Sequence, residues 1–483
     1  MATDYNKYEA VIGLEVHIQL LTESKAFSSD TNAFGERPNT NVSPVSLGHP
    51  GTLPRINTKQ IEYAVRLGLA VGADINKYNE FARKNYFYPD LPKGYQITQD
   101  TTPICTNGAI TINTDGQEKQ IHLTRIHMEE DSGKSIHDQD PFNTLVDLNR
   151  AGVPLLEIVS EPEIRSGDEA QQYLQEVRRL IRYLDISDGN MEEGSMRCDA
   201  NISVRLRGTE AFGTRAEVKN MNSFSHVKQA INYEIKRQID LIEQGGTVVQ
   251  ETRGFNPLDS STFSMRSKEA ANDYRYFPEP DLPPHIIEET YIDSINAKMP
   301  PLPNALKRKY IEELGLSEYD SSLLVDNKAI ALYFEEMITY TKNYKSAANW
   351  LMGPVKSYLN QQAISISDFP VSAKHIATLI ALIDSEKITN TMATQQVFPA
   401  MLKTPEKSPQ KLAEELNLIV ENDVDTLKAM INEVLNNYPE KVQAYKNGQK
   451  GLMGLFMGEV MKLSKGKANP KETTKLLNQL LNQ

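Results

Sequence analysis

The chain has few cysteines and no long apolar run. Its 483 residues include two cysteines, Cys105 and Cys198, and one tryptophan. Two cysteines cannot build a disulfide framework or a four-cysteine zinc site. No stretch approaches the roughly 18 consecutive apolar residues of a membrane span, and the N-terminal segment lacks the basic start and apolar run of a secretory signal. We therefore expect a cytoplasmic protein that contains no zinc and does not enter a membrane.

An excess of positive charge is also absent. Fifty-two basic residues stand against 64 acidic ones, which gives a net charge of −12. This balance argues against a protein that coats nucleic acid, because phosphate neutralisation requires clustered Lys and Arg. One local exception exists: residues 441–475 hold eight lysines and two glutamates, a local charge of +6.

The length predicts about three domains. Short alternating segments separated by turn residues dominate residues 1–292, with helical patterns over Glu169–Leu184 and Val227–Gln244, so we expect an α+β domain on an antiparallel sheet. Seven prolines between Pro278 and Pro303 end this region. Residues 293–404 then read as a helical domain. A polar break with two prolines follows, and residues 405–483 read as a small helical tail.

Strict alternation in Val11–Leu20 divides this predicted strand into an apolar and a polar face. Glu15 and His17 lie on the polar face, close enough to share a cation. A solvated sheet face is the simpler alternative for this segment alone. Two further acids strengthen the case: Glu130 belongs to the acidic run Glu129–Asp131, and Glu157 lies inside an apolar strand, where a charge needs a partner.

The segment Met196–Leu206 also alternates, and its polar face mixes both charges with amide and hydroxyl groups. The residues on this face are Arg197, Asp199, Asn201, Ser203 and Arg205. Several strands with carboxylates on one face predict a sheet whose polar side is an active-site floor. Oxygen ligands with a single histidine suit Mg²⁺ or Mn²⁺ better than zinc.

Two other chemistries have no carrier in this sequence. Gly133-Lys134-Ser135 is similar to the end of a P-loop, but the earlier glycine of that motif falls at Met128. No Gly-x-Ser-x-Gly elbow is present, and neither cysteine lies in a nucleophile motif, so hydrolytic nucleophilic catalysis is not expected.

Eight motifs together resemble the GatB family, whose members are the B subunits of tRNA-dependent amidotransferases. They are Val11–His17, Arg83–Asp90, His127–Asp131, Leu145–Arg150, Glu157–Pro162, Met191–Asn201, Asp273–Asp281 and Gly451–Pro470. The resemblance extends over essentially the whole chain. It implies a cradle domain related in fold to glutamine synthetase, then a helical domain and a mobile tail.

The resemblance also implies an activity. A member of this family uses ATP to phosphorylate the side-chain carboxylate of glutamate on tRNA(Gln), of aspartate on tRNA(Asn), or of both. Ammonia then displaces phosphate and leaves the amide. The ammonia comes from a separate amidase subunit, GatA, and the small subunit GatC clamps the two together.

The family's metal-binding positions correspond to Glu15, His17, Glu130 and Glu157, with Mg²⁺ or Mn²⁺ as the ion. Catalytic roles fall to Glu130, Asp199 and Arg197, and we expect Glu130→Gln to abolish acyl-phosphate formation. Candidate nucleotide-binding residues are Lys84, Lys134 and Arg205, and candidate tRNA-binding residues are Lys450, Lys462, Lys465 and Lys467. Some relatives carry a four-cysteine zinc knuckle, which two cysteines cannot form.

Two alternatives remain open. The first alternative is a stand-alone ligase that acts on a free carboxylic acid. The second is a non-catalytic RNA-binding scaffold. The basic tail weighs against the first, and the concentrated carboxylates weigh against the second, because carboxylates repel RNA phosphates. ATP hydrolysis that depends on misacylated tRNA separates all three hypotheses.

The basic tail yields a first prediction. Removing the residues beyond Lys403 should raise the KM for charged tRNA at physiological salt, because lysine contacts position the tRNA backbone. The remaining chain should still fold, which its circular dichroism and thermal melting will show. An unchanged KM for charged tRNA would count decisively against a role of the tail in tRNA binding.

Overall fold

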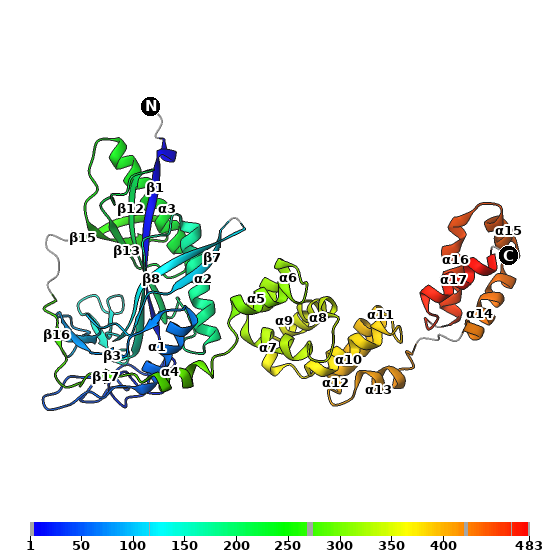
Figure 1. The fold of residues 1–483 in the computed structure, drawn as a ribbon, viewed down its shortest axis with the longest axis horizontal. Helices are drawn as coiled ribbons and strands as arrows, with labels where there is room; N and C mark the ends of the chain where they lie inside the picture. The colour runs from blue at the N-terminus through cyan, green and yellow to red at the C-terminus, as the bar shows by residue number, and fades with distance from the viewer. Residues whose placement is uncertain (1–3, 115, 268–273, 420–423, 465, 482–483) are drawn as a thin grey trace. The chain divides into compact units, whose positions relative to one another are not determined.

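The computed structural model describes residues 4–114, 116–267, 274–419, 424–464 and 466–481. The chain forms two compact units, Met1–Leu302 and Pro303–Gln483. The first unit contains the large sheet and the second is helical (Figure 1). Among the helices described, none is long and apolar enough to cross a membrane.

The main sheet of the first unit runs in the order β15-β14-β13-β12-β1-β11-β8-β5-β4-β16. These strands are β1 (Tyr8–Gln19), β4 (Ala82–Asn85), β5 (Tyr95–Thr98), β8 (Gln117–Glu130), β11 (Pro154–Ser160), β12 (Met196–Leu206), β13 (Ala216–Lys219), β14 (Glu251–Asn256), β15 (Ser261–Ser267) and β16 (Phe277–Pro278). Strands β13 and β14 are parallel, and the other neighbours in this order are antiparallel. The expected antiparallel sheet is therefore a mixed one.

Shorter strands complete this unit. Strands β2 (Asp74–Ile75), β6 (Cys105–Thr106) and β7 (Ala109–Thr114) extend the main sheet, and two separate pairs form from β3 (Tyr78–Asn79) with β17 (His285–Ile286) and from β9 (Lys134–Ile136) with β10 (Leu145–Asp147).

Strand β1 lies in the middle of the sheet, and alternation decides what each of its faces meets (Figure 1). Its apolar face, including Ile12, Leu14, Val16 and Ile18, is fully buried in one hydrophobic core. Helices α1 (Thr58–Ala70), α2 (Gly167–Tyr183) and α3 (Phe224–Glu243) contribute to that core. The opposite face of β1 is left for polar side chains.

Serine caps start both predicted helices of this unit. The Ser166 hydroxyl accepts from the Glu169 amide at the start of α2, and the Ser223 hydroxyl accepts from the His226 amide at the start of α3. The observed ranges confirm the helices predicted over Glu169–Leu184 and Val227–Gln244.

The first unit extends past the predicted boundary at residue 292. Helix α4 (Glu289–Asn296) spans that boundary, and its Ile292 and Ile295 are buried in the same core as β1. The compact unit ends at Leu302, directly before the last of the seven prolines.

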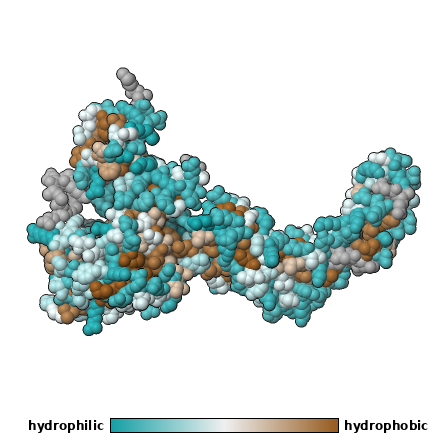
Figure 2. Space-filling view, viewed as in Figure 1, coloured by the Kyte–Doolittle hydropathy of each residue, from teal (hydrophilic) through white to brown (hydrophobic). Residues whose placement is uncertain are grey.

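The described residues of the second unit form helices and no strand. Its helices are α5 (Pro303–Glu312), α6 (Glu318–Val325), α7 (Lys328–Met337), α8 (Tyr344–Trp350), α9 (Lys356–Gln362), α10 (Ala373–Asp384), α11 (Asn390–Met392), α12 (Phe398–Lys403), α13 (Pro409–Glu415), α14 (Val424–Asn437), α15 (Pro439–Lys446), α16 (Met453–Leu463) and α17 (Pro470–Leu481). The visible surface of these helices is mostly hydrophilic (Figure 2), because their apolar residues pack inward. A further division at residue 404 stays a prediction.

Candidate active site

Strand register lines up charged side chains on the polar face of the sheet. On β1, His17 lies opposite Arg197 of β12 on one side and Glu157 of β11 on the other. Glu157 in turn lies opposite His127 of β8. Glu15 lies opposite Asp199. Residues far apart in the sequence thus form a continuous polar floor across four strands.

The first acid group on this floor consists of His17, Glu129 and Glu157, whose ligand atoms all lie within 4.8 Å of one another. The Nε2 atom of His17 is 3.3 Å from Oε2 of Glu157 and 3.5 Å from Oε1 of Glu129. His127 also contacts Glu157, at 3.2 Å. Two carboxylates and one imidazole are a donor set that suits Mn²⁺ or Mg²⁺.

Burial and mutual contact shift the pKa values of the residues in this group. Burial alone lowers the pKa of His17, but the Glu157 and Glu129 carboxylates outweigh it and raise that pKa to about 9. Burial also raises the pKa of Glu129. Although burial opposes it, His17 and His127 hold the pKa of Glu157 well below its usual value. The two carboxylates therefore favour the protonated form of His17 at neutral pH, and a bound cation would take the place of that proton.

The second acid group, Glu15, Asp199 and Glu217, has the same spacing of ligand atoms, within 4.8 Å. Lys219 contacts Asp199 and lies 3.0 Å from Oε1 of Glu217. Asn201 Nδ2 donates to Glu15 Oε1 at 2.9 Å. Burial, followed by the charges of Glu157, Asp199 and Glu217, raises the pKa of Glu15. Two carboxylate-rich groups thus lie beside each other on one floor.

Arg197 contributes the main guanidinium of the floor. Its Nη2 lies 3.0 Å from Oδ2 of Asp131, which also accepts from Nε2 of Gln19 at 2.8 Å. Burial opposes ionisation of Asp131, but Arg197 and Arg150 hold its pKa below the usual value. The pair fixes Arg197 beside His17, where it can neutralise an anion.

Glu130 is a correction to the predicted metal site, because the structure does not bring it into either acid group. Its carboxylate pairs with Lys93, and its Oε1 accepts from the Ile97 amide at 2.9 Å. The reason is the alternation of β8: His127 and Glu129 share one face, so Glu130 points to the other. Glu129, and not Glu130, lies with His17 and Glu157.

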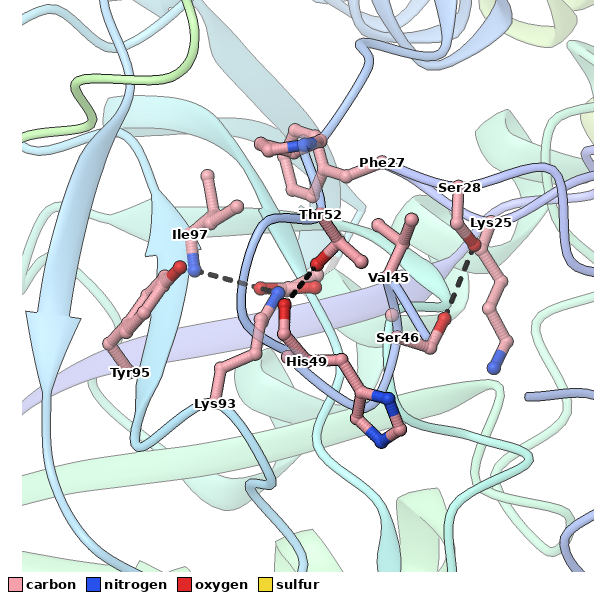
Figure 3. A pocket seen from close by; sticks show the side chains of 14 residues that line it. Lys25, Phe27, Ser28, Val45, Ser46, His49, Thr52, Lys93, Tyr95 and Ile97 are labelled. Carbon is pink, nitrogen blue, oxygen red and sulfur yellow. Dashed lines mark hydrogen bonds and ion pairs between the residues drawn. The ribbon is translucent and has the colours of Figure 1, made fainter. Parts of the chain in front are cut away.

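Glu130 lines a small cavity of about 70 Å³. Figure 3 shows Tyr95 and Ile97 on one side of it and Ser28, Ser46 and Lys25 on the other. Lys25 is 1% exposed, and its Nζ donates to the Asn41 carbonyl at 2.6 Å. Burial lowers the pKa of Lys25 to about 8.

Of the predicted nucleotide-binding residues, only Lys84 borders the floor. Lys84 lies on β4, and its Nζ is 4.8 Å from the ring centroid of Tyr274. Burial lowers the pKa of Lys84, but the charge of Glu129 outweighs burial and raises that pKa. Lys134 is exposed on the separate β9–β10 pair. Arg205 Nε lies 2.8 Å from Oε1 of Glu9, toward the far end of β12. The structure brings neither of these two to the acid groups.

The predicted tRNA-binding lysines lie in the tail. Lys450 and Lys462 are exposed, and Lys467 Nζ donates to Asn417 Oδ1 at 2.7 Å. Lys465 lies outside the described residues. Near them, Phe456 and Val460 are buried in a core formed by residues 427–481.

Sequence reasoning gave Glu129, His127 and Glu217 no metal-binding or catalytic role. The alternation of β8 already contained the signal for Glu129 and His127, since residues two apart share a face. Glu217 required the pairing of β12 with β13, which places it opposite Asn201.

Comparison with known proteins decides the family. Residues 10–293 match the family model described as the GatB/GatE catalytic domain, and residues 332–481 match the GatB domain. The chain belongs to the GatB/GatE family. This confirms the resemblance found in the motifs.

Relatives from several bacteria match almost end to end, and each is named as the B subunit of an aspartyl/glutamyl-tRNA(Asn/Gln) amidotransferase. The protein of Geotalea uraniireducens is 50% identical over 99% of this chain and 100% of its own length. The protein of Persephonella marina is 49% identical over 98% and 100%, and that of Caldicellulosiruptor bescii is 47% identical over 98% and 99%.

The floor geometry yields a second prediction. Glu129→Gln should weaken Mn²⁺ binding at least about tenfold, because a buried ligand charge is lost from the His17 group. Its neighbour offers a matched control: Glu130→Gln should keep the affinity within about twofold, since that carboxylate contacts Lys93 instead. Titration followed by the electron paramagnetic resonance of free Mn²⁺ measures both. Equal losses in the two variants contradict the assignment.

Proposed function

We propose that the polar floor phosphorylates the side-chain carboxylate of misacylated Glu-tRNA(Gln), Asp-tRNA(Asn) or both, using ATP, and converts it to the amide with ammonia. The observation that carries this proposal is the pair of acid groups on one sheet face, His17–Glu129–Glu157 and Glu15–Asp199–Glu217. The names of the relatives support it. The same proposal includes a glutamine-synthetase-like cradle and a cytoplasmic location.

The chemistry explains why such a floor is needed. A carboxylate is a poor electrophile, so ammonia does not attack it directly at neutral pH. When a carboxylate oxygen attacks the γ-phosphorus of ATP, ADP leaves and an acyl phosphate forms. Ammonia then attacks the acyl carbon, and phosphate leaves with the electron pair of the broken C–O bond. Both steps depend on positioning and on neutralising charge.

The residues of the floor divide these tasks. The carboxylates and His17 would hold Mg²⁺ or Mn²⁺, and such an ion supplies charge neutralisation on the ATP phosphates. Arg197, fixed by Asp131, stabilises negative charge on the transferred phosphoryl group. Lys84 stands at the rim of the floor, and we assign it to the nucleotide or the tRNA end. Lys134 and Arg205 receive no role because they lie away from the acid groups.

Ammonia has to come from another chain. Both cysteines are buried, and burial raises the pKa of each thiol, so neither is a ready nucleophile for glutamine hydrolysis. We propose that a GatA-like amidase, held by a GatC-like subunit, supplies it. Glu130 in its cavity then serves ammonia delivery rather than metal binding. Lys450, Lys462 and Lys467 would contact the tRNA backbone.

A third prediction tests the division between Glu129 and Glu130. In the complex with its partner subunits, Glu129→Gln should lower ADP formation that depends on misacylated tRNA at least about a hundredfold, because the metal group loses a charge. Contrary to the expectation from the sequence, Glu130→Gln should retain ADP formation, because its carboxylate contacts Lys93 and lies in neither acid group. Coupled detection of ADP, with glutamine or ammonium as nitrogen donor, measures both variants.

Controls make the outcome decisive. The wild-type complex should form ADP only with misacylated tRNA, and ammonium should replace glutamine. Rescue of Glu129→Gln amidation by ammonium means that Glu129 serves nitrogen delivery, and rapid ADP formation with uncharged tRNA contradicts the proposed function itself.

A further inference from the structure

The reaction leaves most residues of two sequence motifs unexplained. These motifs are Arg83–Asp90 and Asp273–Asp281, and the structure describes Tyr274–Asp281 of the second. They lie side by side at the edge of the main sheet, where β16 pairs with β4 and Phe277 lies opposite Arg83. The fold thus brings together segments that are about 190 residues apart in the sequence.

Specific polar contacts lock the two segments together. Arg83 donates from Nε and Nη2 to the two carboxylate oxygens of the buried Glu279, at 2.7 and 2.8 Å. The amide of Asn85 donates to the Tyr274 carbonyl at 2.9 Å. Asn85 Nδ2 donates to the Arg275 carbonyl at 2.8 Å. A bidentate pair to a buried carboxylate fixes position as well as contributing energy.

Backbone strain marks the same place. Arg275 has φ of 47°, in the left-handed region that a residue with a Cβ rarely adopts. Such strain persists only where the surroundings hold it, and the hydrogen bond from Asn85 does so here. Strained residues of this kind concentrate at ligand-binding sites.

The locked segments place four tyrosines in a row, which we call the tyrosine row: Tyr88, Tyr86, Tyr274 and Tyr276. Successive ring centroids are 6.0, 6.2 and 6.0 Å apart, with edge-to-face geometry at each step. The two end rings are accessible, since Tyr88 is 57% and Tyr276 41% exposed. Phe87, between the first two in sequence, is 89% exposed.

The tyrosine row borders the active-site floor. The Nζ atom of Lys84 lies 4.8 Å from the ring centroid of Tyr274. Lys84 pairs with Gln96 of β5, and Gln96 Nε2 donates to Glu129 Oε2 at 3.1 Å, which connects the row to the first acid group. When a ligand stacks on the row, the part of it next to the stacked portion therefore lies close to the acid groups.

We propose that the tyrosine row binds the single-stranded 3′ end of the charged tRNA by stacking its bases. This proposal rests on the proposed function, which requires the amino acid esterified to the last ribose to reach the floor. Proteins hold single-stranded nucleic acid by stacking successive bases on aromatic rings, with little dependence on sequence. The tyrosine row beside the floor offers aromatic rings on which the bases of the last nucleotides can stack.

The length of the row favours a strand over the adenine of ATP. One base covers about one ring, whereas the tyrosine row has four rings and ends on exposed ones. A strand of several nucleotides can reach both exposed end rings, which a single adenine cannot.

The test removes rings from the protein and nucleotides from the RNA in a double-mutant cycle. Tyr88→Ala and Tyr276→Ala are made separately in the complex with its partner subunits, with Tyr88→Phe and Tyr276→Phe as ring-retaining controls. Tyr319→Ala, on α6 and 72% exposed, controls for loss of a surface tyrosine elsewhere. Each is titrated with uncharged tRNA, intact and lacking its last three nucleotides.

Trimming the tRNA should weaken binding by the wild-type complex about tenfold or more, and this effect should shrink at least about threefold in each alanine variant. The phenylalanine variants and Tyr319→Ala should behave as wild type. In amidation assays the KM for charged tRNA should rise about tenfold in the alanine variants, with the KM for ATP unchanged.

An equal trimming effect in wild-type and alanine complexes overturns the proposal, as does a rise in the KM for ATP alone, which would make the row an adenine site for ATP. Both alanine variants are compared by thermal melting with the wild-type complex. If wild type forms no ADP in response to misacylated tRNA, the proposed function fails, and the binding cycle still reports on the row.

Discussion

Carboxylates concentrated on one face of a single sheet are the constraint on which the rest of the structure depends. Like charges about 4 Å apart repel by about 4 kcal/mol at an effective dielectric constant of 20. His17 offsets part of this cost in one acid group, and Lys219 offsets part in the other. In the proposed reaction, a divalent cation bound with ATP would supply the remaining positive charge.

The opposite face of the same strands makes this concentration tolerable. Ile12, Leu14, Val16 and Ile18 of β1 are fully buried against the core that α1, α2 and α3 help to form. Each such side chain contributes about 1.5–3 kcal/mol relative to exposure. Because residues alternate strictly, the apolar face fixes where Glu15 and His17 point. Core packing and placement of the charged groups are therefore one property of the strand, and a shift of register by one residue would lose both.

Features that depend on local pattern could be predicted from the sequence. Alternation in Val11–Leu20 correctly separated Glu15 and His17 from the core, and apolar periodicity located α2 and α3. The choice of Glu130 over Glu129 followed a motif instead of the alternation of β8, which places Glu129 and not Glu130 beside His17 and Glu157. Long-range pairing could not be predicted: nothing local says that Glu217 joins Glu15, that β13 and β14 run parallel, or that Asn85 holds Tyr274 and Arg275.

In the proposed function, the floor activates the substrate by phosphoryl transfer to its carboxylate. The most direct test uses misacylated tRNA whose side-chain carboxylate carries ¹⁸O, incubated with the complex, ATP and ammonium. Mass spectrometry then follows the label. The account predicts one ¹⁸O atom in inorganic phosphate for each amide formed, because phosphate leaves with a carboxylate oxygen. Label in AMP, or phosphate without label, would contradict it.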